Sequence, residues 1–234
     1  MKDAVVSLSL TKEIKFLATE KGGKVSGLLV KPKNAKAFLV LAHGAGAGMR
    51  HRFMEEICAK LSDRGIATLR YQFPYMENGS KRPDSESVLT STVRSAVSAG
   101  KDLAGGTPMF AGGKSMGGRM TSLAAARESL EGVKGLVFFG FPLHAAGKPS
   151  AERGKHLKEI DAPMLFLQGT RDALADLKLL RPLCRNLGNR AELFTIDGAD
   201  HSYHVLKSSG RSDGEILEQV AVKSASWMDE VAAG

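Results

Sequence analysis

A serine stands at the centre of the pattern G-x-S-x-G, which residues 113–117 form. An apolar run at 108–111 precedes the pattern and a stretch with helical spacing follows it, so the serine falls between a strand and a helix. Because such a turn is tight, the residues two positions before and after the serine must lack a Cβ atom, and Gly113 and Gly117 do. We expect the turn to expose the hydroxyl of Ser115 above the sheet edge, where it can act as a nucleophile.

A serine hydroxyl becomes a good nucleophile only when a base takes its proton, and an acid must orient that base. Asp172 comes just after the apolar run 164–167, and His201 comes just after the run 193–196. The order serine, aspartate, histidine is the one that accompanies this kind of turn. We expect Ser115 to attack a carbonyl carbon, His201 to carry the proton, and Asp172 to hold the imidazole in its reactive tautomer.

Other residues could fill the roles of acid and base. Asp176 and Asp200 are alternative acids, although Asp200 adjoins the histidine, where a carboxylate often only fixes a turn. His204 is an alternative base, three residues beyond His201. We expect His43 to brace its loop rather than to transfer protons.

The segment 43–48 reads His-Gly-Ala-Gly-Ala-Gly and directly follows the apolar run 38–42. Acyl transfer places negative charge on a carbonyl oxygen, and backbone N–H groups aimed at that oxygen stabilise it. A loop of glycine and alanine allows a close approach, so we expect Gly44 to lie against the substrate. The expected donors are the N–H groups of Ala45 and Met116.

Two nucleotide-binding patterns are incomplete in this chain. A phosphate-binding Walker loop that ends at Ser115 needs glycine at the position of Pro108. A dinucleotide fingerprint that begins at Gly44 needs glycine at the position of Met49. The chemistry expected of Ser115 requires no metal and no cofactor, so we expect neither.

The elements that must position these residues follow one rhythm, in which short apolar runs alternate with longer amphipathic stretches. Apolar runs without polar alternation are typical of parallel strands that are covered on both faces. These runs lie at 38–42, 66–69, 108–111, 136–139, 164–167 and 193–196. The rhythm predicts an α/β fold with a mostly parallel central sheet and helices on both faces.

Apolar residues repeat at helical spacing between the runs. The repeats are Phe53, Ile57 and Leu61; Leu89, Val93 and Val97; Leu177, Leu180, Cys184 and Leu187; and Leu217, Val220, Ala221, Met228 and Val231. Pro182 falls inside the third repeat, and we expect it to break that stretch into two pieces. The first 31 residues differ, because they predict antiparallel strands at one sheet edge. Their alternating apolar residues are Val6, Leu8, Leu10, Ile14, Phe16 and Ala18.

The composition is that of a globular protein with a large core, since 43% of the 234 residues are hydrophobic and 25% are charged. We find no linker and expect one domain over residues 1–234. No apolar run approaches the ~18 residues of a membrane span. Cys58 and Cys184 are expected to be buried, and so few cysteines favour a reducing, cytoplasmic compartment. The net charge is +8 without a long block of like charges, so we expect neither a nucleic-acid nor a membrane partner.

Four segments carry a family resemblance: HGAGAG at 43–48, GGKSMGGR at 112–119, QGTRD at 168–172 and DGADHSYH at 197–204. Together they resemble the α/β-hydrolase superfamily, and more closely its small lidless group related to dienelactone hydrolases. That group includes the hydrolase-like domain of a regulatory subunit of the non-specific lethal histone acetyltransferase complex. The resemblance covers about residues 24–232 and implies an eight-stranded type of sheet, the same three catalytic residues and the same two oxyanion donors. Dienelactone hydrolase itself uses a cysteine nucleophile, so Ser115 argues against dienelactone chemistry.

Many members of this superfamily insert a cap domain before the strand that bears the acid, but only residues 141–163 are available for one here. We therefore expect no cap domain and an open site, lined in part by Tyr71, Phe141 and Leu143. The sequence predicts a serine hydrolase that cleaves carboxylic esters of small molecules through an acyl-enzyme on Ser115, with thioesters and small amides as further candidates. The alternative is a non-catalytic interaction module on the same scaffold, because a fold does not fix a function.

Overall fold

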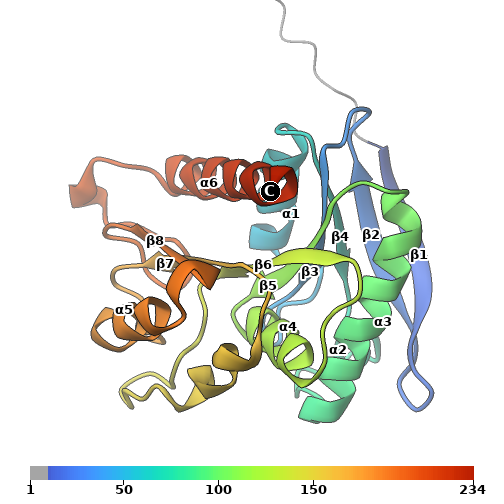
Figure 1. Cartoon of the computed structure of the whole chain (residues 1–234), viewed down its shortest axis with the longest axis horizontal. Coiled ribbons are helices and arrows are strands. Elements are labelled where there is room, and N and C mark those ends of the chain that lie inside the picture. The colour runs from blue at the N-terminus through green and yellow to red at the C-terminus, as the bar shows by residue number, and fades with distance from the viewer. Residues whose placement is uncertain (1–9) are drawn as a thin grey trace, which may run out of the picture.

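A computed structural model describes residues 10–234 of the chain. Eight strands form one sheet in the spatial order β1-β2-β4-β3-β5-β6-β7-β8, which runs through the middle of the molecule (Figure 1). The strands are β1 (Leu10–Thr19), β2 (Gly23–Lys31), β3 (Ala37–Ala42), β4 (Ile66–Tyr71), β5 (Met109–Lys114), β6 (Val133–Phe139), β7 (Met164–Gly169) and β8 (Ala191–Ile196). All the apolar runs predicted as strands are confirmed, with ends that differ by at most three residues.

The sheet is parallel over most of its width and antiparallel at one edge. β3 pairs in parallel with β4 and β5, and the same sense continues through β6, β7 and β8. β2 runs antiparallel to both β1 and β4. The predicted antiparallel edge is confirmed for Ile14, Phe16 and Ala18, which lie in β1, whereas Val6 and Leu8 lie outside the described residues.

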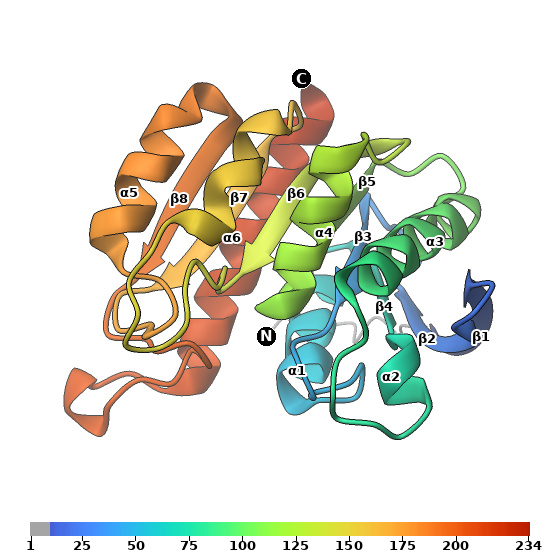
Figure 2. The same ribbon diagram turned by 90° about the horizontal axis from the view of Figure 1, so that it is seen from below.

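Helices cover both faces of the sheet, as the rhythm predicts. On one face lie α1 (Arg52–Ser62) and α6 (Asp213–Ala233), which contact each other. On the other face lie α3 (Glu86–Ala104), α4 (Met116–Arg127) and α5 (Leu177–Asn186), as Figures 1 and 2 show. The short elements are α2 (Pro74–Glu77) and the 3₁₀ helices η1 (Glu152–Glu159), η2 (Gly188–Arg190) and η3 (Lys207–Ser209).

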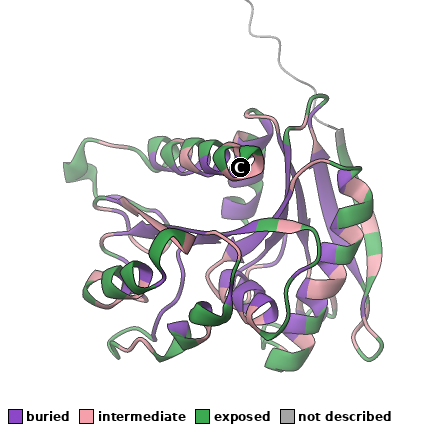
Figure 3. Cartoon of the chain, in the orientation of Figure 1, coloured by how far each residue is buried: buried purple, intermediate pink, exposed green. Residues whose placement is uncertain are grey.

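The strands lack polar alternation because each face of the sheet meets its own helices. In β3, Phe38 and Val40 belong to the core with α3, α4 and α5, whereas Leu39 and Leu41 belong to the core with α1 and α6. Successive side chains of a strand point to opposite faces, so every position of β3 is buried. Figure 3 shows a buried sheet between helices whose outer faces are exposed.

The expectation that Pro182 divides its helical stretch is wrong, because α5 runs unbroken through it. The proline removes a single hydrogen-bond donor from the helix. Leu180 and Cys184, on either side of the proline, are buried against the sheet. Their burial offsets the missing hydrogen bond, since burying one large apolar side chain contributes about 1.5–3 kcal/mol.

Within the described residues, no large insertion covers the edge at which the parallel strands end. Only a loop and η1 separate β6 from β7, so the described residues contain no cap domain, as expected. β5, β7 and β8 end at this edge, and β8 is one of the two outermost strands of the sheet. Within residues 10–234, no helix combines the length and the hydrophobicity that a membrane crossing requires.

Candidate active site

Ser115 occupies the turn between β5 and α4, with φ +52° and ψ −119°. Residues other than glycine rarely adopt such a conformation, which costs about 1–3 kcal/mol. The turn is tight, as predicted: a Cβ atom on Gly113 would lie 2.5 Å from the carbonyl carbon of Gly117, and one on Gly117 would lie 2.4 Å from the carbonyl oxygen of Ala42. Only glycine fits at both positions, and their contacts hold the serine in its strained conformation.

The structure brings Ser115, His201 and Asp172 together from the ends of three strands. His201 Nε2 lies 2.8 Å from Ser115 Oγ, and His201 Nδ1 lies 2.7 Å from Asp172 Oδ2. Since a carboxylate only accepts hydrogen bonds, Nδ1 carries the imidazole proton and Nε2 can accept the serine proton. The Asp172 side chain is fully buried, whereas that of His201 is 25% exposed. Small molecules can therefore reach the imidazole but not the carboxylate.

Two further donors hold the carboxylate of Asp172. Its Oδ1 accepts from the Leu174 N–H at 2.8 Å, and its Oδ2 also accepts from the side-chain amide of Gln168. The Gln168 oxygen in turn accepts from the Phe141 N–H at 2.9 Å. Sequence reasoning missed Gln168. The signal that could have found it is its polar side chain, which stands next to an apolar run that is typical of a buried strand. Because both ends of its amide are fixed, Gln168 also fixes the carboxylate that faces His201.

His43 braces the glycine-rich loop. Its Nδ1–H donates to the Gly44 carbonyl at 2.7 Å, and its Nε2 accepts from the Phe73 N–H at 3.2 Å. Burial lowers the pKa of His43 to about 4, so the ring is neutral at pH 7. With both ring nitrogens occupied, His43 fixes the path of the chain as it leaves β3.

The backbone amides of Ala45 and Met116, beside Ser115, have no acceptor within the described part of the chain. The next amide of the loop, that of Gly46, is occupied because it donates to a tyrosine hydroxyl at 3.0 Å. Gly44 lies against the nucleophile, since a Cβ atom there would lie 3.7 Å from the Cβ of Ser115. The turn and the loop that border Ser115 thus both offer unused donors, and Ala45 and Met116 are among them.

The alternative acids and the alternative base have other partners. Asp176 caps α5 by accepting from a backbone N–H of its first turn at 2.8 Å. Asp200 accepts from two N–H groups of its own turn, at 2.8 and 3.0 Å. His204 Nδ1 pairs with Asp213 at 3.0 Å on the exposed surface. None of these three side chains takes part in the contacts that join Ser115 to the buried carboxylate.

The expectation that Tyr71, Phe141 and Leu143 line the site is wrong, because their exposed fractions are 1%, 0% and 0%. Tyr71 packs edge-on against Phe73 with ring centroids 5.5 Å apart, and Phe141 packs against Phe138 with centroids 5.4 Å apart. Tyr71 is the last residue of β4, whereas Phe141 and Leu143 follow β6, and all three side chains belong to the core, where burial stabilises them. They support the site from within the molecule.

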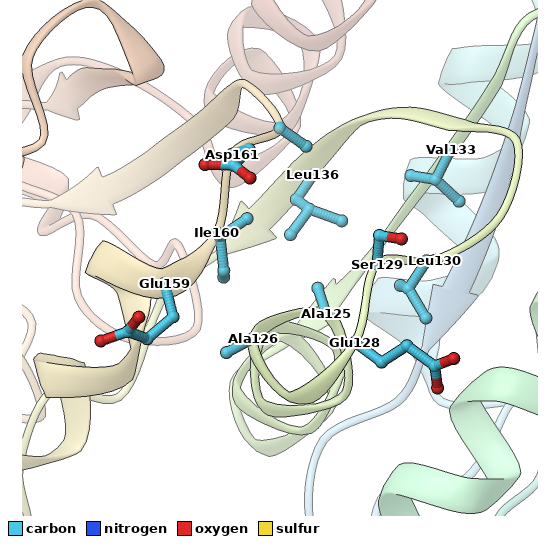
Figure 4. A pocket seen from close by; sticks show the side chains of 11 residues that line it. Ala125, Ala126, Glu128, Ser129, Leu130, Val133, Leu136, Glu159, Ile160 and Asp161 are labelled. Atoms are coloured by element: carbon cyan, nitrogen blue, oxygen red, sulfur yellow. The ribbon is translucent and has the colours of Figure 1, made fainter.

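One cavity, of about 180 Å³, lies away from Ser115, where α4 ends and β6 begins (Figure 4). Apolar side chains such as Leu130 and Leu136 line it, and carboxylates such as Glu159 and Asp161 stand beside it. It shares no lining residue with the contacts at Ser115. Among the described residues, no three His, Cys, Asp or Glu side chains are grouped as metal ligands would be.

Known proteins share this architecture. A family model described as an alpha/beta hydrolase domain matches residues 35–229. The dienelactone hydrolase from Anabaena variabilis ATCC 29413 has a TM-score of 0.74 at 20% identity, over 95% of this chain and 98% of that chain. XC6422 from Xanthomonas campestris, described as a serine hydrolase without lid, has a TM-score of 0.70 at 16% identity, over 92% and 94%. Est1E from Butyrivibrio proteoclasticus has a TM-score of 0.70 at 19% identity, over 95% and 99%.

At these identities the likeness to the solved structures concerns the fold, and it extends over nearly the full length of each chain. The sheet order and the placing of the helices agree with the fold that the sequence predicts. Because the family model matches most of the length of this chain, the chain belongs to the α/β-hydrolase family.

Proposed function

We propose that this protein is a serine hydrolase that cleaves carboxylic esters of small molecules. Ser115 is the nucleophile, His201 the base, and Asp172 the acid that orients the base. The observation that carries the proposal is the unbroken series of contacts from Ser115 Oγ through the imidazole to the buried carboxylate, 2.8 and 2.7 Å long. The solved neighbours include proteins described as esterases and serine hydrolases, which supports the same reaction class.

In the first half-reaction, Ser115 Oγ attacks the ester carbonyl carbon while His201 Nε2 takes the hydroxyl proton. Negative charge gathers on the carbonyl oxygen, and the N–H groups of Ala45 and Met116 donate hydrogen bonds to it. The bond to the leaving group then breaks, and His201 gives its proton to the departing alkoxide. The acyl group stays on Ser115, and the carboxylate of Asp172 stabilises the imidazolium while it exists.

In the second half-reaction, water attacks the acyl carbon and His201 Nε2 takes a proton from it. The ester bond to Ser115 breaks, Oγ recovers the proton, and the carboxylic acid leaves. The 25% exposure of His201 supports this step, since water must reach Nε2. Thioesters and small amides are further candidates because they present the same carbonyl group to the nucleophile.

The absence of a cap domain from residues 10–234 supports small or short-chain substrates over long lipid chains. Est1E has been solved with ferulic acid bound, so feruloyl esters belong in a first substrate screen. We further propose that the chain acts as one domain, because all the described strands join one sheet. Cys58 and Cys184 are buried and free, which supports a reducing, cytoplasmic location.

Hydrolysis of p-nitrophenyl acetate by the wild type and by two serine variants tests the proposal. Ser122→Ala is a matched control, because Ser122 Oγ also lies 2.7 Å from a histidine nitrogen, that of His156, but the residue is fully buried. We expect Ser115→Ala to lose turnover while its circular dichroism stays native, and Ser122→Ala to keep turnover. A fluorophosphonate probe should label one site, Ser115, in the wild type and the control.

Turnover that survives in folded Ser115→Ala protein would contradict the proposal. A folded wild-type protein that neither hydrolyses esters nor reacts with the probe would instead favour a non-catalytic interaction module on this scaffold.

A further inference from the structure

Lys114 is the residue just before Ser115, and its side chain reaches the loop that carries His201. Its Nζ donates to the carbonyl oxygen of His201 at 2.5 Å. The ammonium also lies 5.6 Å from the ring centroid of Phe53 and 5.4 Å from that of Tyr203, and such ring faces attract a cation. The last residue of β5 thus contacts the backbone of the proposed base, while the next residue is the proposed nucleophile.

The ammonium of Lys114 and the imidazole of His201 border the same small space. A Cβ atom on Gly140 would lie 3.0 Å from Lys114 Nζ and 3.5 Å from both Nδ1 and Cε1 of His201. Gly140 has φ +66°, a conformation that favours glycine, so both the backbone and the neighbours exclude a side chain there. The ammonium and the imidazole therefore lie close together beside this glycine.

The charged groups that face Lys114 are the carboxylates of Asp172 and Asp200. Burial lowers the pKa of Lys114 to about 8, and these two carboxylates act in the opposite direction. The amine is therefore still mostly protonated at pH 7. Tyr203, the other titratable neighbour, is neutral because burial raises its pKa.

The loop of His201 needs a firm anchor because its backbone is strained. Tyr203, two residues further on, has φ +65°, which is unfavourable for an aromatic residue. Its hydroxyl donates to the Leu167 carbonyl at 2.8 Å, and its ring stacks on Phe53 with centroids 5.7 Å apart. Lys114 supplies a second anchor, from the strand that leads to the nucleophile.

Building on the function proposed above, we propose that Lys114 is a positioning residue for the acyl-transfer reaction. It ties the His201 loop to the strand of Ser115 through the hydrogen bond from Nζ to the His201 carbonyl. The tie keeps Nε2 within hydrogen-bond distance of Oγ.

Three lysine variants test this role, with the rate of fluorophosphonate labelling at a fixed pH as the readout. Lys114→Met removes the donor and the charge at similar length, whereas Lys114→Arg keeps both. Lys31→Met is the matched control, because Lys31 Nζ also donates to a backbone carbonyl, that of Leu103 at 2.8 Å, but joins β2 to the end of α3.

We expect Lys114→Met to label at least about tenfold more slowly, because without the donor the loop no longer holds Nε2 against Oγ. Lys114→Arg should recover most of the rate, and Lys31→Met should match the wild type. The recovery in Lys114→Arg separates the proposed role from a loss of packing, because Lys114→Met keeps the length of the side chain and lacks only the donor and its charge. Should Lys114→Met fail to fold, the smaller Lys114→Gln is measured in the same way.

Labelling of Lys114→Met at the wild-type rate, or labelling of Lys114→Arg as slow as that of Lys114→Met, would overturn the role of Lys114 and leave the proposed function intact. A wild-type protein that does not label contradicts the proposed function instead. Amide hydrogen exchange of the loop 197–204 then decides about Lys114 without any turnover. Exchange must be faster in Lys114→Met than in the wild type, and an unchanged rate overturns the proposal.

Discussion

Replacing Ser115 by glycine is expected to stabilise the fold relative to replacing it by alanine. Residue 115 has φ +52° and ψ −119°, which glycine adopts freely and other residues only at a cost of about 1–3 kcal/mol. The unfolded chain of the glycine variant also has more conformational entropy, which lowers the free energy of unfolding by about 0.4–1 kcal/mol. Both variants lose the contact with His201, so their difference isolates the backbone. We expect Ser115→Gly to be more stable than Ser115→Ala by about 1 kcal/mol.

Thermal and urea unfolding of the two variants at pH 7, side by side, measure this difference. For a chain of this length, 1 kcal/mol corresponds to a rise in Tm of about 2–4 °C, which calorimetry resolves. Neither variant carries the hydroxyl, so neither should hydrolyse esters. A glycine variant that is no more stable than the alanine variant would refute the inference that the nucleophile turn is strained.

Three further changes test the site. Gly117→Ala should destabilise the fold by about 3 kcal/mol in urea melts, because its Cβ would lie 2.4 Å from the Ala42 carbonyl oxygen, and a variant as stable as the wild type would contradict that packing. Asp172→Asn should lower kcat by about 10³–10⁴-fold, because an amide cannot replace every bond of the carboxylate, and unchanged kcat would remove Asp172 from the mechanism. Burial holds the pKa of His43 at about 4, below its ordinary 6.5, so between these two pH values only the unfolded chain takes up this proton. The contribution of the neutral His43 to the free energy of unfolding is therefore fully present above pH 6.5 and is lost as the pH falls towards 4. Urea melts should show that His43→Asn loses less free energy of unfolding than the wild type between pH 6.5 and 4, by up to about 3 kcal/mol. An equal loss in both proteins would contradict this assignment.

The strands and the nucleophile turn could be predicted because each leaves a strong local pattern. A run such as 38–42 is apolar throughout since helices cover both faces of the sheet. Gly113 and Gly117 are required by backbone contacts within the turn itself. Asp172 and His201 could be named because parallel strands end at one edge, so residues that follow different strands arrive close together.

Other features depend on packing that residue types do not reveal. Phe141 and Leu143 follow a strand end, where a large apolar side chain can turn to a ligand or to the core, and the structure buries both. Pro182 stays inside α5 because burial of its neighbours outweighs its local preference. Gln168 and Lys114 reach the site through side chains whose directions are set only once the sheet has assembled.

The position of β8 at the rim of the sheet affects how the protein responds to mild denaturation. An outermost strand has one neighbouring strand instead of two, so it opens at a smaller free-energy cost than an interior strand such as β5. The loop that carries the imidazole follows β8, whereas the serine follows β5. Local opening at the rim would separate the two groups while most of the ordered structure persists. Loss of hydrolysis would then precede global unfolding and would report the local stability of the last strand.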